Sequence, residues 1–148
     1  MAELGIDLTW GSTSEFLDTV DAIPKAVNFA TLVGHGTVRA AGVGYDDRPP
    51  TADELAEMCR LVEEAMQAGA FGLSSGLVYA PGCYARTDEL ITLSRAAAQH
   101  GGFYATHMRN EGERLLDALD EALRVGRESG ASVQISHHKA CGRSSWGT

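Results

Sequence analysis

The feature that most constrains the fold is a unit that recurs along the chain: a short apolar segment of β-strand character, then an amphipathic helical segment that ends at glycine. Strand character comes from β-branched and aromatic residues, and helix character from apolar residues about three and four positions apart. Such alternation implies parallel strands joined by right-handed crossovers. The sequence therefore predicts an α/β fold of about four parallel strand–helix units, with strands at 26–33, 70–73, 103–106 and 133–136.

Helices are expected between these strands, and each has a recognisable start or stop. Thr51 and Glu54 form a capping box, because the threonine hydroxyl can accept from the third backbone N–H while the glutamate reaches back. Thr87 is expected to cap the second helix, and the third runs from about 113 to 128. We expect stops at Gly69, Gly101 and Gly130, and core-facing side chains at Leu55, Met58, Leu61, Val62, Ala65 and Met66 on the first helix and Leu115, Leu116, Leu119, Leu123 and Val125 on the third.

Four units are half of the eight that close a (βα)8 barrel, which typically takes about 250 residues. The chain has 148 residues, so we expect 26–148 to form a partial (βα)8, TIM-type barrel, a fragment preceded by a lead-in over 1–25. Two alternatives fit the same pattern: a half-barrel that completes itself by association, and an open four-stranded sheet. Because the outer strands would carry unpaired backbone groups, we expect the rest of a barrel or a second copy as a partner.

The composition excludes several classes of function. The formal net charge is −8 and no basic strip occurs, so no nucleic-acid partner is expected, because phosphate binding needs clustered Lys and Arg. Apolar runs stop well short of the roughly 20 residues of a membrane span, and Met1–Glu3 lacks the basic start of a signal peptide. The 3 cysteines form no C-x-x-C pair, which argues against a disulfide framework. We expect a cytoplasmic protein that binds a small molecule.

Two histidines follow the third and fourth predicted strands at equivalent positions. Because the carboxyl ends of successive parallel strands meet at one edge of a sheet, the rings of His107 and His137 are expected to lie close together. With the period of two of a strand, His137 shares a face with Ile135, whereas His138 points the other way. A single histidine on an apolar strand would more often be structural. Two at matching strand ends predict His107 and His137 as ligands of a catalytic zinc ion.

Three other side chains are candidates for binding a carboxylate substrate. Arg109 and Lys139, together with Arg143, lie just beyond strand ends in an otherwise acidic chain, which would create a local positive patch; ordinary solvated charge is the alternative. Tyr79, on the long loop after the second strand, could donate to the same carboxylate, although a loop tyrosine more often packs.

For two further segments, a structural explanation is at least as good as a functional one. His35 lies between two glycines, a pattern that fits a turn at least as well as a supporting position behind the site. Asn110–Glu113 places acidic residues at the start of a predicted helix, and helix-end electrostatics alone would explain them.

At these residues the sequence resembles the N-acyl-D-amino-acid deacylases, also called D-aminoacylases, of the metal-dependent amidohydrolase superfamily. The resemblance implies that the strands are the third to sixth of a (βα)8 barrel, with His107 and His137 as metal ligands and Tyr79 and Lys139 holding the substrate carboxylate. It also implies zinc-dependent hydrolysis of the amide bond of N-acyl-D-amino acids, releasing a carboxylate and a D-amino acid. The blocks of similarity are specific when taken together in this order and spacing. They comprise Trp10, 15–18, 32–39, 46–49, 69–79, 104–112 and 135–139.

Parts of the family's pattern have no counterpart in this sequence. These are a His-x-His on the first barrel strand, a metal-binding Cys on the second and a catalytic Asp on the eighth. None of Cys59, Cys83 and Cys141 lies where that cysteine belongs, so no cysteine ligand and no catalytic residue are assigned, and the chain as given is expected to be inactive. Two alternatives remain: an amidohydrolase acting on a cyclic amide, and a non-catalytic half-barrel that binds a carboxylated small molecule.

Overall fold

The computed structural model describes residues 9–147, so the first 8 residues of the expected lead-in lie outside the described part. A single parallel sheet has the order β1-β2-β3-β4, and its strands alternate with helices as predicted. The fold is therefore that of a partial (βα)8 barrel. The elements are α1 (Thr13–Asp21), β1 (Val33–Gly34), α2 (His35–Gly42), α3 (Ala52–Gln67), β2 (Gly72–Gly76), η2 (Gly82–Tyr84), α4 (Thr87–Gln99), β3 (Phe103–His107), α5 (Leu115–Ser129), β4 (Val133–Ile135) and η3 (Arg143–Ser145).

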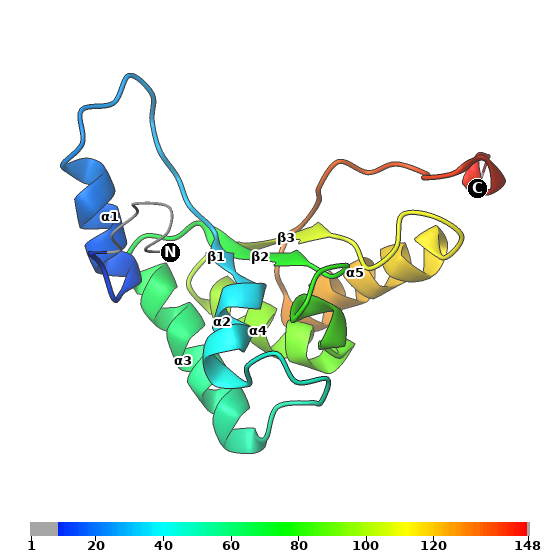
Figure 1. Ribbon diagram of the computed structural model, residues 1–148, viewed down its shortest axis with the longest axis horizontal. Helices are drawn as coiled ribbons and strands as arrows, with labels where there is room; N and C mark the ends of the chain where they lie inside the picture. The colour runs from blue at the N-terminus through cyan, green and yellow to red at the C-terminus, as the bar shows by residue number, and fades with distance from the viewer. Residues whose placement is uncertain (1–8, 148) are drawn as a thin grey trace, which may run out of the picture.

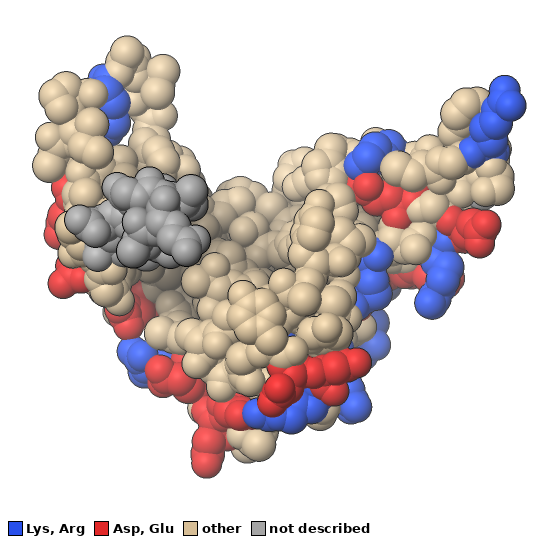
Figure 2. Space-filling view, viewed as in Figure 1, with Lys and Arg blue, Asp and Glu red and all other residues tan. Residues whose placement is uncertain are grey.

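The sheet lies above the helices in Figure 1, between two arms formed by α1 with the connection after it and by the residues beyond β4. The main core fills the space between sheet and helices, where Leu73 of β2 and Tyr104 of β3 pack against Leu90, Leu93 and Val125. In the space-filling view of Figure 2 the surface between the arms is hollowed and mostly uncharged, while charged side chains gather on the helices and on the C-terminal arm. Among the described residues, no helix combines the length and apolar character that a membrane crossing requires.

The first strand is much shorter than predicted. Of residues 26–33, only Val33 enters the sheet, and β1 pairs with β2 through Val33 opposite Leu73 and Gly34 opposite Ser74. Val27 and Phe29 lie outside the sheet and are exposed. Apolar, β-branched composition favours a strand, but a strand also needs a regular ladder with a neighbour. Thr31 O accepts from Phe71 N at 2.9 Å, and the paired register with β2 begins only at Val33. The second strand is likewise displaced, from 70–73 to Gly72–Gly76.

Helix α2 was not predicted. The Gly-His-Gly sequence suggested a turn, yet His35 is the first residue of a helix that begins directly after β1 and buries His35, Val38 and Arg39. Tertiary contacts of these side chains overcome the low helix propensity of the flanking glycines.

The helices α3 and α4 differ in how well their starts were predicted. The capping box of α3 is confirmed: Thr51 Oγ1 accepts from Glu54 N at 3.3 Å, and Glu54 Oε2 accepts from Thr51 N at 2.7 Å. The predicted cap at Thr87 is wrong, because Arg86 is the N-cap and the Thr87 hydroxyl donates to Glu121 at 2.8 Å instead. A partner on another helix thus replaces the local bond.

The buried face of α5 matches the prediction only in part: Leu115 and Val125 are buried and Leu119 packs against the core, as expected, but Leu116 and Leu123 do not face it. Its buried residues are Leu115, Ala118, Ala122, Val125 and Ser129, whereas Leu116 and Leu123 are 57% and 41% exposed. The small alanines permit close packing of α5 on α4 and β4, and Leu116 and Leu123 are turned away from the core.

Candidate metal centre

The ends of β3 and β4 bring two histidine rings into contact. His107 is the last residue of β3, and His137 follows β4 by two residues with a positive φ of 40°. Because the strands are parallel and in register, with Thr106 opposite Ile135, both residues leave the sheet at the same edge. His107 Nδ1 lies 2.9 Å from His137 Nε2, and the ring centroids are 4.6 Å apart. The expected convergence of the two rings is confirmed.

The carboxylate of Glu111, for which the sequence predicts only a favourable charge at a helix start, completes this group. Helix α5 begins only at Leu115, so Glu111 lies in the connection after β3, and its side chain is 10% exposed. One carboxylate oxygen of Glu111 is 3.0 Å from His137 Nδ1, and the other is 4.0 Å from His107 Nε2. One ligand atom from each of His107, Glu111 and His137 can be chosen so that all lie within 4.8 Å of one another. The sequence indicated an acidic residue shortly after a strand end, but nothing in it indicated that this side chain turns back to the two histidines.

A positive charge lies among these donors. The Lys139 ammonium is 2.6 Å from Glu111 Oε2 and 3.1 Å from His137 Nδ1. Burial alone would raise the pKa of Glu111, but the hydrogen bond from Lys139 and the neighbouring His107 outweigh it and hold the pKa below its usual value. Glu111 is therefore an ionised carboxylate. Two imidazoles and one carboxylate are a donor set used by catalytic zinc sites, and the arrangement accommodates a cation, so the residues fit a zinc ion.

The predicted substrate-binding residues divide into two groups. Tyr79 lies on the loop after β2, is 65% exposed, and its ring centroid is 5.6 Å from that of His107. Together with Lys139 it therefore borders the cluster. Arg109 instead points toward α5, where Glu121 accepts two of its hydrogen bonds at 2.9 and 3.0 Å.

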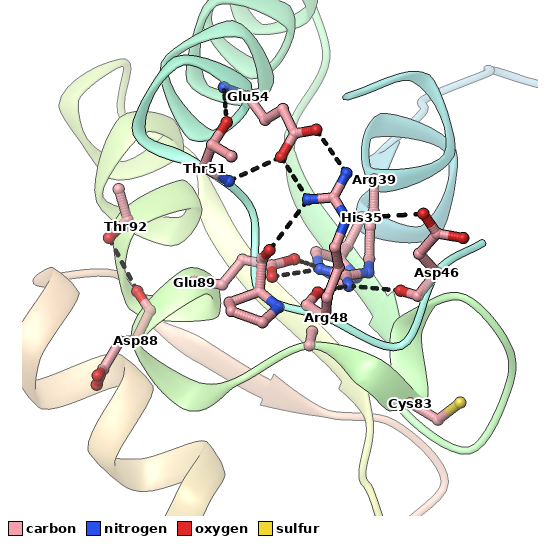
Figure 3. Close-up of polar contacts among 12 residues, drawn as sticks. His35, Arg39, Asp46, Arg48, Thr51, Glu54, Cys83, Asp88, Glu89 and Thr92 are labelled. Carbon is pink, nitrogen blue, oxygen red and sulfur yellow. Dashed lines mark hydrogen bonds and ion pairs between the residues drawn. The ribbon is translucent and has the colours of Figure 1, made fainter. Parts of the chain in front are cut away.

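His35 takes part in a separate buried network, shown in Figure 3. Its Nε2 lies 2.8 Å from Glu89 Oε1, and Arg39 donates to the other oxygen of Glu89. All three side chains are at most 2% exposed. Burial alone would raise the pKa of Glu89, but the hydrogen bond with His35 and the charge of Arg39 hold it below its usual value. The network joins α2 to the first turn of α4, and no sequence pattern indicated it.

The chain is similar to known deacylases over most of its length. No protein-family model matches it. The D-aminoacylase of Alcaligenes xylosoxydans xylosoxydans is 48% identical over 134 residues, which make up 90% of this chain and 28% of that protein. A structure of D-aminoacylase, solved to examine its binuclear metal centre, superposes with a TM-score of 0.88 and 45% identity over 92% of this chain and 29% of that one.

A second solved structure matches equally well in fold. N-acyl-D-glutamate deacylase from Bordetella bronchiseptica, complexed with zinc and a phosphonate mimic of the tetrahedral intermediate, has a TM-score of 0.88 and 36% identity over 92% of this chain and 29% of that one. The chain thus spans about three-tenths of the length of these metal-binding relatives. By sequence and by fold, the chain is similar to a part of the N-acyl-D-amino-acid deacylases, and its strand–helix units match a part of an amidohydrolase barrel.

Proposed function

We propose that this chain supplies metal ligands and substrate-binding groups of a zinc-dependent N-acyl-D-amino-acid deacylase. The reaction is hydrolysis of the amide bond of an N-acyl-D-amino acid, which releases a carboxylate and a D-amino acid. The observation that carries the proposal is the cluster of His107, Glu111 and His137 at the ends of neighbouring strands, in a sequence 48% identical to a D-aminoacylase.

Each residue has a defined role in this proposal. His107, His137 and Glu111 would hold zinc, and three protein ligands leave a fourth position for water or substrate. Zinc, when bound, supplies Lewis-acid activation of the amide carbonyl and of water. With Glu111 engaged as a ligand, the half-exposed Lys139 would pair with the substrate carboxylate, and the exposed Tyr79 would donate to it.

Proton transfer and cellular location depend on other features of the chain. No proton-transferring residue is assigned in this chain, so we expect no turnover until further residues of a barrel, or a second copy, join the sheet. The free thiols of Cys59, Cys83 and Cys141 fit a reducing compartment, and we propose a cytoplasmic location.

Calorimetric titration of the 148-residue chain with zinc tests the metal centre. We expect one zinc per chain and an affinity that falls at least roughly tenfold in His107→Ala and in His137→Ala. His138→Ala is the matched control, because this exposed neighbour of His137 has no part in the cluster. Equal affinity in His107→Ala and wild type would reject the site.

Substrate recognition is tested by NMR titration of the zinc-loaded chain with N-acetyl-D-methionine and its carboxamide. Lys139→Ala should weaken binding of the carboxylate and leave binding of the carboxamide unchanged, because only the carboxylate can pair with the ammonium. Equal losses on both ligands would show that Lys139 is structural. Release of free D-methionine that is lost in His107→Ala would show instead that the chain alone builds a working site.

A further inference from the structure

The loop between β2 and α4 carries Tyr79 and is tied to the cluster at its start. Leu77 N donates to His107 O at 3.1 Å, which fixes the first residue after β2 to the end of β3. Tyr79 then folds back over the strand end, since a Cβ at Gly76 would lie 3.0 Å from the Tyr79 ring. The position of the Tyr79 ring beside His107 therefore depends on how the rest of this loop is held.

Arg109 holds the far half of the loop from the side of β3. Its Nη1 donates to Cys83 O at 3.0 Å, and its Nη2 donates to Ala85 O at 2.9 Å. Cys83 N in turn donates to Tyr79 O at 2.9 Å. A single residue, Cys83, therefore links the guanidinium to the backbone of Tyr79.

The charge of Arg109 is balanced within the fold. Glu121, with a side chain 14% exposed, accepts from Arg109 Nε at 2.9 Å and from Nη2 at 3.0 Å. The same carboxylate accepts from the Thr87 hydroxyl at 2.8 Å, at the start of α4. The guanidinium thus donates hydrogen bonds to one carboxylate and two carbonyls. Its planar fork permits this arrangement, which a lysine ammonium cannot reproduce.

The opposite side of the loop rests on the buried network of α2. A Cβ at Gly82 would lie 3.7 Å from His35 Nδ1 and 2.8 Å from Gly76 O, so the turn at Gly82 packs closely against the His35 ring and the end of β2. His35 is itself fixed by Glu89 in the first turn of α4. The loop is thus confined between the His35 ring and the Arg109 guanidinium.

From these contacts we infer that Arg109, oriented by Glu121, is a positioning residue that sets the Tyr79 ring beside His107, and that it does not itself bind the substrate carboxylate. The inference deepens the proposed function and rests on it for the role of Tyr79. The placement of the ring, however, is a property of the chain without zinc or substrate and can be measured separately.

The first experiment reads that placement by the nuclear Overhauser effect between the ring protons of Tyr79 and His107. The cross-peak should be present in wild type and lost in both Arg109→Met and Arg109→Lys, because lysine keeps the charge but not the fork. Arg114→Met is the matched control, since this exposed arginine pairs with Asp117. If Arg109→Met does not fold, Arg109→Lys and Glu121→Gln carry the test. An undiminished cross-peak in the folded variants would overturn the inference.

The second experiment is a double-mutant cycle on the binding of N-acetyl-D-methionine to the zinc-loaded chain. Arg109→Lys should weaken binding roughly tenfold in the wild-type background and have no further effect in Tyr79→Ala, because it acts through that ring. Losses that add would assign Arg109 its own contact with the substrate and overturn the inference. Failure of the wild-type chain to bind zinc or this ligand would reject the proposed function, while the cross-peak would still decide the positioning role.

Discussion

At the residue scale, Glu111 changes what the two histidines can do. Two imidazoles alone are fewer ligands than a zinc ion normally takes from a protein, whereas two imidazoles with one carboxylate match a common catalytic set. Glu111 is also the ionised group that the Lys139 ammonium contacts, so its charge organises the whole cluster.

Replacement of Glu111 should therefore weaken zinc binding without disturbing the fold. We expect Glu111→Gln to lower zinc affinity at least roughly tenfold in calorimetry, because a neutral amide oxygen is a poorer ligand than a carboxylate. Glu113→Gln is the control, since Glu113 is exposed two residues further along the same connection. An effect of the same size in both variants would point to loss of general negative charge.

Glu89 carries a buried charge that should contribute to stability. Glu89→Gln removes the negative charge that pairs with the buried Arg39, and we expect a loss of about 3 kcal/mol in the free energy of unfolding at pH 7. Because the pKa of Glu89 is lower in the folded chain than its ordinary value of 4.5, its carboxylate stabilises the fold fully above about pH 4.5. That stabilisation is lost as the pH falls through the folded-state pKa.

Urea unfolding of wild type and Glu89→Gln between pH 7 and pH 3 measures this effect. The difference in the free energy of unfolding between wild type and Glu89→Gln should become smaller as the pH falls. Asp88→Asn is the control, because the Asp88 side chain is 83% exposed and pairs with Arg124 at the surface. A difference that stays constant across the pH range would contradict the assignment of the stabilising charge to Glu89.

At the scale of elements, α5 shows how small residues decide the orientation of a helix. Ala118 and Ala122 face the core, so the helix lies close to its neighbours, and Gly126 continues that approach: a Cβ there would lie 2.5 Å from Val133 on β4. The outward leucines add apolar surface to the molecule but little to this core.

Truncations on the two faces of α5 should differ sharply in cost. Val125→Ala removes methyl groups from a side chain with no exposed surface, and we expect a loss of roughly 2 kcal/mol. Leu123→Ala, on the outward face, should cost less than about 1 kcal/mol although it removes more atoms. Chemical denaturation of both variants checks the comparison, and a larger loss in Leu123→Ala than in Val125→Ala would contradict this orientation of α5.

The elements that could be predicted are those whose signals are local. The capping box at Thr51 and the glycine stop at Gly69 fix α3 by contacts within a few residues, and the apolar run at 103–106 lies in β3. Helix α2 and the position of Glu111 could not be predicted, because they depend on partners distant in sequence. His35 pairs with Glu89, 54 residues away, and Glu111 pairs with Lys139, which follows α5 whereas Glu111 precedes it. The two strand-end histidines were found because parallel topology itself brings them together.

At the scale of the whole molecule, the open sheet leaves β1 and β4 each with one unpaired edge. Such edges favour addition of further strands, and the exposed Leu116 and Leu123 lie on the helix that precedes β4. We therefore expect the mass in sedimentation velocity to rise with concentration over the micromolar range. Gln134→Lys places a charge on the exposed side chain of the edge strand β4 and should reduce this association. A mass that stays that of one chain at all concentrations would show that the edges are protected.

The small separation in sequence between His107 and His137 links metal binding to folding. The two rings are 30 residues apart in sequence and meet through a single strand–helix–strand unit, so their contact requires one modest loop closure. A ligand that binds only the closed arrangement stabilises it in proportion to the logarithm of its concentration. Bound zinc would thus make separation of β4 from β3 rarer, and the concentration of zinc would set how much of the time this last unit of the sheet is docked.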